Sequence, residues 1–168
     1  MKRRLGSACG KCIGLALFAA LLAATPGAAE EAGREAKAPT VHVPVRMNPD
    51  KLAGVDLPVE APFIPPEDVL EGSHQPRGEV LYRGEELVME IFEHGPATFA
   101  SSFSYDEYVL VLSGKLILTD AGGQVHEFVA GDSLVIPKGF TGTWKVLGNY
   151  RELVAIGRAA YDKAYPTE

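Results

Sequence analysis

Residues 95–146 decide the fold, and they read GPATFASSFSYDEYVLVLSGKLILTDAGGQVHEFVAGDSLVIPKGFTGTWKV. This stretch contains three runs of alternating β-branched and apolar residues, at 107–112, 115–119 and 133–137. Each run ends at a glycine-containing turn, which is typical of short β-strands. The fixed points of the pattern are Glu107, Gly114, Gly131, Pro137, Gly139 and Trp144. Many short strands at close spacing favour a sandwich or a closed barrel, so the stretch predicts an all-β domain.

Further β-like runs flank this stretch, at 79–82, 87–92, 142–147 and 152–156. The last two are separated by a predicted turn at Gly148-Asn149, and one helical turn is expected after Gly157. We therefore expect the compact domain to cover residues 77–162 and a short tail to cover 163–168.

The first 29 residues are organised like a secretory signal peptide. Basic residues precede a 12-residue apolar run, Ile13–Ala24, and small residues follow it. A membrane span needs about 20 apolar residues, so this run is too short to be an anchor. We expect cleavage after Ala29 and a periplasmic or secreted protein, with no membrane association after cleavage. Both cysteines, Cys9 and Cys12, lie in this segment, which excludes disulfides and Cys-ligated zinc from the mature chain.

Cleavage would remove four of the 16 basic residues and none of the 22 acidic ones. The mature chain would then carry 12 basic and 22 acidic residues, a net charge of −10. Such a surface repels phosphate backbones, so nucleic-acid partners are excluded.

Residues 30–76 are expected to be a linker followed by an extended, proline-rich arm. Residues 30–40 are small and polar, whereas 41–76 hold seven of the 12 prolines together with many apolar side chains. Prolines prevent a helix or a central strand, yet so much apolar surface needs cover. We expect the arm to lie on the barrel or on a partner subunit, with an edge strand at 41–45. A homodimer formed through the arm or the outward strands is therefore one open alternative.

The glycine-proline framework resembles the two motifs of the cupins, G-x5-H-x-H-x3-4-E-x6-G and G-x5-P-x-G-x2-H-x3-N. Glu107 and Gly114 match the end of the first motif, and Gly131, Pro137 and Gly139 match the start of the second. The resemblance covers about residues 77–157 and implies a cupin jelly-roll β-barrel of the RmlC-like kind. The segment ending in Trp144 is similar to the branch that includes (S)-ureidoglycine aminohydrolase and the EutQ proteins.

The metal-binding histidines of the cupin motifs are missing. Their three positions hold Ser101 and Phe103 (or Ala100 and Ser102) and Gly142. A metal cupin needs about three imidazoles and a carboxylate around one ion. Only the carboxylate of Glu107 remains, so no cofactor is predicted; any metal would be held weakly, through Glu107.

The resemblance implies that Glu107 points into the barrel, as its counterpart does in metal cupins. Strand alternation then places Trp144 inside as well, with Gly142 making room for the indole. Together with Phe103 and Tyr105 they would form a mostly apolar pocket with one anchoring charge. Two structural alternatives stay open: Trp144 fills the core, and Glu107 is a structural carboxylate.

The histidines that remain give little evidence of a site. His42 and His74 lie in the arm and are expected to be solvated, and His126 is expected on a hairpin face. His94 is the one considered for acid–base chemistry, with a surface position as the alternative.

Three hypotheses follow for the function. The first is an exported barrel that binds a small polar metabolite without a metal. The second is an enzyme of the ureidoglycine aminohydrolase-like branch, either an amidohydrolase or a metal-free isomerase. Its catalytic candidates are Glu107, His94 and Tyr105. The third is a domain that only mediates dimerisation or supports another protein.

Overall fold

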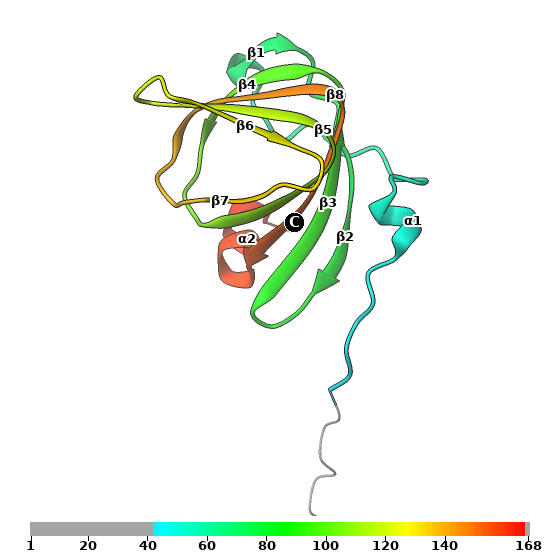
Figure 1. Ribbon diagram of the computed structural model, residues 1–168. Helices are drawn as coiled ribbons and strands as arrows, with labels where there is room; N and C mark the ends of the chain where they lie inside the picture. The colour runs from blue at the N-terminus through cyan, green and yellow to red at the C-terminus, as the bar shows by residue number, and fades with distance from the viewer. Residues whose placement is uncertain (1–41, 167–168) are drawn as a thin grey trace, which may run out of the picture. The chain divides into compact units, whose positions relative to one another are not determined.

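The computed structural model describes residues 42–166, so the predicted signal peptide and linker lie outside the described residues. Figure 1 shows a curled β-barrel with one helix, α2, beside one end of it. The elements in chain order are α1 (Pro49–Leu52), η1 (Pro66–Asp68, a 3-10 turn), β1 (Val69–Gly72), β2 (Arg77–Arg83), β3 (Leu87–His94), β4 (Ala97–Ser102), β5 (Glu107–Asp120), β6 (Val125–Val129), β7 (Ser133–Ile136), β8 (Thr141–Gly157) and α2 (Arg158–Ala164).

The strands of the described residues form one antiparallel sheet of eight strands, curled into the barrel. The long strands β5 and β8 pair with each other along their whole length. The first half of β8 also pairs with β4, and its second half pairs with β3. In the same way β5 pairs first with β7 and then with β6. The predicted all-β barrel is confirmed.

The structure corrects the predicted breaks at Gly114 and at Gly148-Asn149, because β5 and β8 continue through both points. The register of the ladder between β5 and β8 shifts on either side of Ser113, so the strands bend there without ending. Gly114 has a φ of 72°, and a Cβ there would lie 2.7 Å from the Tyr150 Cα. Glycine therefore permits the crossing of two bent strands at this corner rather than a turn.

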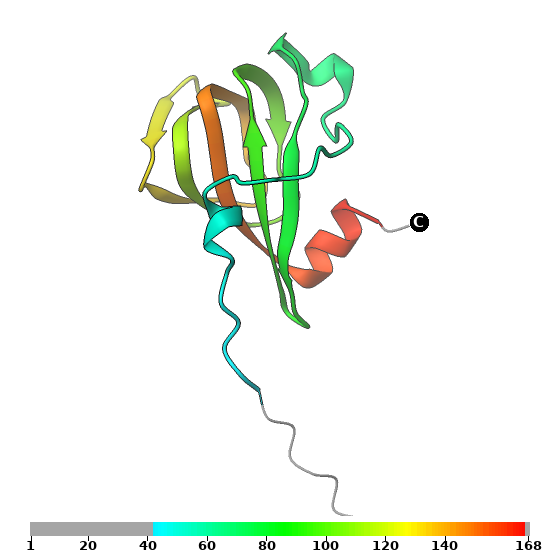
Figure 2. The same ribbon diagram turned by 90° about the vertical axis from the view of Figure 1, so that its right-hand side faces the viewer.

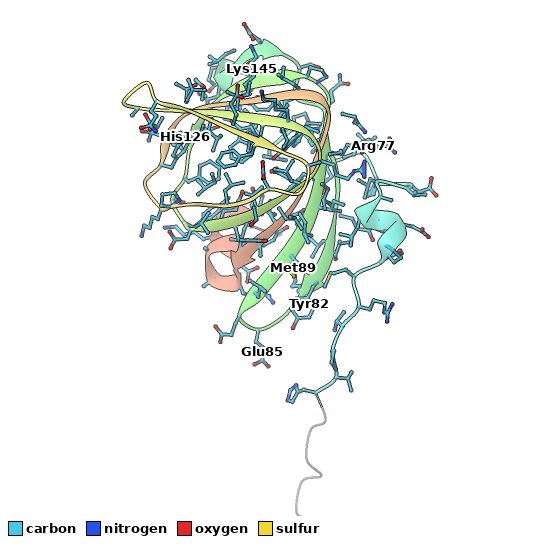
Figure 3. All side chains as sticks on the ribbon, in the orientation of Figure 1. Arg77, Tyr82, Glu85, Met89, His126 and Lys145 are labelled. Carbon is cyan, nitrogen blue, oxygen red and sulfur yellow. The ribbon has the colours of Figure 1, made fainter. Side chains whose placement is uncertain are left out.

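The hydrophobic core follows the alternation predicted from the sequence. On β5, Val109 and Val111 are 0% and 1% exposed. Tyr108, which precedes Val109 and points to the other face, is 41% exposed. On β8, Val146 is fully buried and Trp144 nearly so. These inward side chains of β5 and β8 belong to one hydrophobic cluster. Figure 3 shows side chains gathered inside the barrel.

The segment between α1 and β1 runs beside β2 (Figure 2). Val59 forms a β-bridge with Arg77, and the Arg77 guanidinium donates two hydrogen bonds to the Leu57 carbonyl. The edge strand expected at 41–45 is not found, since residues 42–45 belong to no strand. None of the helices within the described range has the length and apolar character that a membrane span requires.

Candidate functional site

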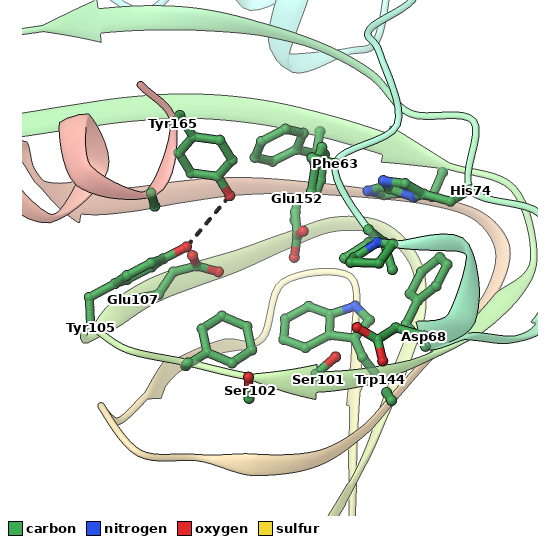
Figure 4. Close-up of a pocket in the computed structure, with 18 residues that line it drawn as sticks. Phe63, Asp68, His74, Ser101, Ser102, Tyr105, Glu107, Trp144, Glu152 and Tyr165 are labelled. Atoms are coloured by element: carbon green, nitrogen blue, oxygen red, sulfur yellow. Dashed lines mark hydrogen bonds between the residues drawn. The ribbon is translucent and has the colours of Figure 1, made fainter. Parts of the chain in front are cut away.

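A cavity of about 390 Å³ lies in the barrel interior. Its walls come from β3, β4, β5 and β8, and segments 63–74 and 164–165 cover it. The four residues predicted to bind a ligand all line it: Glu107, Trp144, Phe103 and Tyr105. The structure therefore brings the predicted site residues together in one space (Figure 4).

The framework matched by the second motif positions the loop that carries Phe103 and Tyr105. The backbone N–H of Gly139 donates to the Phe103 carbonyl at 2.7 Å, and the Phe103 N–H donates to the Phe140 carbonyl at 2.9 Å. The carboxylate of Asp106 accepts a further bond from the Lys138 N–H. The turn at residues 137–140 therefore fixes this loop at the cavity wall.

Trp144 belongs both to the core and to the cavity wall. Its Cα partners across the ladders are Phe99 on β4 and Leu118 on β5. The indole stacks on the Phe103 ring, with centroids 5.8 Å apart and an interplanar angle of 29°. Core packing thus holds one part of the indole while the rest borders the cavity.

The predicted reason for glycine at position 142 is wrong. A Cβ on Gly142 would lie 2.0 Å from the Thr119 carbonyl oxygen of β5, so this glycine permits close approach of two strands. It does not make room for the indole of Trp144.

Glu107 is the first residue of β5, and its side chain is only 7% exposed while it lines the cavity. Within the described residues, no hydrogen bond or ion pair reaches its carboxyl group. Burial, and next the nearby charge of Glu152, raise the pKa of Glu107 well above its usual value. The carboxyl is therefore a buried polar group that has no partner among residues 42–166.

A second buried acid, Glu152 on β8, lines the same cavity and was not predicted. Its carboxylate accepts a hydrogen bond from the Tyr150 hydroxyl at 2.6 Å. Burial raises the pKa of Glu152 to about 7, and burial also raises that of Glu90 on β3 to about 7. Alternation with the buried Val154 and Ile156 would have placed Glu152 inside from the sequence.

His94 lies in the cavity wall and is buried, so the alternative of a surface position is wrong. It follows Val88, Glu90 and Phe92 on the inward face of β3, and this period of two was the overlooked signal. Burial, and next the neighbouring His74, lower the pKa of His94 to about 4. The imidazole is therefore neutral near neutral pH.

His74, expected to be solvated in the arm, is also buried, with 6% exposure. Its ring stacks on His94, with centroids 5.2 Å apart, and meets Phe63 edge-on at 4.5 Å. These rings bury both imidazoles, and neither nitrogen of His74 has a hydrogen-bond partner among the described residues. His42 is exposed, and His126 lies on the β6 hairpin beside Asp120, as expected (Figure 3).

Two aromatic residues outside the predicted site complete the cover of the cavity. Phe63 comes from the arm, and Tyr165 follows α2, in the segment assigned to the tail. The hydroxyl groups of Tyr165 and Tyr105 lie 3.5 Å apart, and the Tyr165 ring meets Phe63 edge-on. Proline-rich and terminal segments give no periodic signal, so sequence patterns could not have placed these two residues.

The donors present do not fit a divalent metal ion. At the positions where cupin motifs carry histidines, Ser101 and Phe103 contribute to the cavity wall and Gly142 lies against β5. Among residues 42–166, no three His, Cys, Asp or Glu side chains are grouped so that they could hold a metal. Glu107, Glu152 and the two buried imidazoles line the same cavity but are not grouped around one point, so they do not form the compact ligand set that a metal requires.

Comparison with known proteins agrees with this fold. Residues 82–155 match the family model described as EutQ-like cupin domain. A putative ethanolamine utilization protein Q from Salmonella typhimurium is 26% identical over 51% of this chain and 72% of that one, with a TM-score of 0.47. A protein of unknown function from Pseudomonas syringae pv. tomato is 19% identical over 60% of this chain and 43% of that one, with a TM-score of 0.54. No curated protein matches the chain.

The matched segment contains the barrel part of the site but not its cover. Glu107, Trp144 and Glu152 lie within residues 82–155, whereas Phe63, His74 and Tyr165 lie outside them. The cavity therefore lies within the matched domain, and segments outside that domain cover it.

Proposed function

The chain is a cupin-domain protein of the EutQ-like type, and we propose that its barrel binds a small polar metabolite without a metal. One observation carries this proposal: the unpartnered carboxyl of Glu107 faces a cavity of about 390 Å³ beside the single tryptophan. The volume falls in the range of small-molecule sites, which combine apolar walls with a few polar groups.

Burial of Glu107 is hard to explain by packing alone. A carboxyl taken out of water destabilises the fold unless hydrogen bonds or a counter-charge compensate. Glu152 has at least the Tyr150 hydroxyl, whereas Glu107 has no partner among the described residues. A bound molecule would supply the missing partner.

Trp144 provides the test, because it is the only tryptophan in the chain and it lines the cavity. A metabolite that enters the cavity should change the intrinsic fluorescence of the indole. Glu107→Gln should then weaken binding of such a ligand tenfold or more, since a charge-assisted hydrogen bond contributes about 1.5–3 kcal/mol.

Glu127→Gln is the matched control, because the Glu127 side chain is 55% exposed on β6 and pairs only with Lys115. It should bind every ligand as the wild type does. Equal affinity of the Glu107→Gln variant and the wild type for every ligand found would contradict the proposed role of Glu107.

We also propose that the protein acts after export, in the periplasm or outside the cell. The basic start, the apolar run and the small residues before Glu30 support this. Mass spectrometry of the chain from the periplasmic fraction should show a mature protein beginning at Glu30. Recovery of the intact chain from the cytoplasm alone would contradict export.

A metal-free isomerase is the second candidate function. Glu152, with a pKa raised to about 7, shares the cavity with Glu107 and the neutral His94. A base with a pKa near the working pH is suited to proton abstraction from carbon. Incubation of a bound metabolite with the protein in D₂O should then introduce deuterium at carbon. If no deuterium is incorporated, the isomerase is contradicted and only the binding function is left.

A further inference from the structure

The groups of the described cavity wall that can carry a charge near neutral pH are all acids. Asp68, Glu107 and Glu152 line the cavity, and no lysine or arginine of residues 42–166 does. The two imidazoles in the wall, His74 and His94, are buried, and burial lowers the pKa of both, so they add no positive charge at neutral pH. An anionic ligand would therefore meet only acids and neutral rings.

The part of the chain that the structure describes provides no counter-charge for the two buried acids of the cavity. Ion pairs elsewhere in the described residues include Glu93 with Arg151, whose nitrogen and oxygen atoms are 3.1 Å apart. None of the ion pairs within residues 42–166 involves Glu107 or Glu152. The carboxyl of Glu107 is more than nine-tenths buried and directed into the cavity, where a positive group could reach it.

The rest of the wall is rich in aromatic rings. Trp144 and Phe103 are stacked along one side, and Tyr105 and Tyr165 bring their rings and hydroxyl groups beside Glu107. Figure 4 shows the carboxyl groups of Glu107 and Glu152 pointing into the space that these rings border. Aromatic faces attract cations, and more strongly when water is excluded.

We propose that the ligand is a small organic cation, an amine or a quaternary ammonium compound, with Glu107 as its counter-charge and the aromatic rings around it. This inference rests on the proposed function and narrows it to one class of ligand. Glu152 and the hydroxyl groups of Tyr105 and Tyr165 surround the same charge.

The proton balance of the site agrees with a cationic ligand. Burial and mutual repulsion favour the protonated form of the two acids, and a cation favours the ionised form. Binding should therefore release a proton, and affinity for a permanent cation should rise with pH. The rise in affinity should follow ionisation of these two acids. The pKa of Glu107 lies well above its usual value, and that of Glu152 is about 7.

Four probes with one phenethyl body and different head groups test the charge. Phenethylamine and phenethyltrimethylammonium are cations, 2-phenylethanol is neutral and 3-phenylpropanoate is an anion. Their binding to the mature wild-type protein is followed by Trp144 fluorescence and by calorimetry, at pH 5.5 and pH 8. We expect at least one cation to bind tenfold or more tightly than the alcohol and the anion, and phenethyltrimethylammonium to bind more tightly at pH 8.

The outcomes separate this inference from the function on which it rests. Binding of the alcohol or the anion as tight as that of the cations would overturn the cationic ligand and leave the metabolite-binding barrel standing. An affinity for phenethyltrimethylammonium that is the same at pH 5.5 and pH 8 would contradict the proposal that Glu107 and Glu152 act as its counter-charges. Failure of all four probes, and of every metabolite in a wider screen, would overturn both proposals.

Discussion

At the scale of single residues, the cavity is defined by acids that the fold keeps in an apolar place. Glu107 and Glu152 approach from β5 and β8, and both pKa values are raised by burial. The ionised forms of these acids destabilise the folded chain relative to the unfolded one. We propose that a bound ligand offsets this cost, because packing among the described residues supplies no partner for Glu107.

Glu152→Gln should make this cost measurable. An acid whose pKa is 4.5 when unfolded and about 7 when folded contributes fully to stability below pH 4.5, and the contribution is lost as the pH rises through about 7. The glutamine variant keeps an acceptor for the Tyr150 hydroxyl and loses the titration. Its free energy of unfolding, relative to wild type, should rise by up to about 3 kcal/mol between pH 4.5 and about pH 8.

Urea denaturation across this pH range gives the comparison. Parallel pH profiles of the variant and the wild type would show that Glu152 ionises as freely in the folded chain as in the unfolded one. Glu127→Gln, with its exposed side chain, serves as the reference for the loss of a surface acid.

The direction of a side chain could be predicted from the sequence only where the residue lies on a regular strand, because side chains there alternate between the two faces. The resemblance to cupins placed Glu107 inside, and strand alternation then placed Trp144 inside as well. The same alternation would have found Glu152 and His94. Phe63, His74 and Tyr165 lie on irregular segments, where the side-chain direction depends on packing that only the folded chain provides. The absence of histidines from the motif was visible in the sequence, whereas the aromatic cover was not.

At the scale of elements, the two long strands β5 and β8 determine both the barrel and the site. Gly114, which was predicted to end a strand, is a point where these strands bend and cross. Gly142, which was predicted to make room for an indole, is a point where they approach closely. The sequence rule treats a glycine in a strand as an interruption, but backbone proximity at Gly114 and Gly142 can be seen only when the partner strand is in place.

Gly142→Ala tests the close approach of β8 to β5. The added methyl group would lie 2.0 Å from the Thr119 carbonyl oxygen, which belongs to backbone that cannot move without breaking ladder hydrogen bonds. We expect a loss of about 2–3 kcal/mol or more in the free energy of unfolding. Thermal and urea denaturation measure it.

Gly95→Ala is the matched control, since a Cβ at Gly95 meets nothing within 4 Å and its stability should change by less than about 0.5 kcal/mol. Equal stability of the Gly142→Ala variant and the wild type would mean that the two strands lie farther apart than the structure shows.

At the scale of the whole molecule, stability depends on pH through opposing groups. The buried acids make the folded chain more stable at low pH. The stacked imidazoles of His74 and His94 make it more stable at higher pH. A histidine with a pKa of 6.5 unfolded and about 4 folded stays neutral in the barrel. Its contribution to stability is complete above pH 6.5 and is lost as the pH falls toward 4.

His94→Gln should therefore reduce acid sensitivity. Between pH 6.5 and pH 4 the wild type should lose up to about 3 kcal/mol more than the variant does. The comparison of pH slopes is independent of any constant packing loss caused by the substitution. A slope that is the same in both proteins would show that His94 is protonated freely in the folded chain.

The central claim is that the barrel holds a ligand between the carboxyl of Glu107 and the indole of Trp144, without a metal. A crystal structure of the mature protein with its tightest-binding probe tests this claim most directly. We expect the polar head of the probe within hydrogen-bond distance of Glu107 and its body against Trp144. A Glu107 side chain turned out of the barrel, a probe bound elsewhere, or an ion coordinated by protein side chains in the cavity would contradict it.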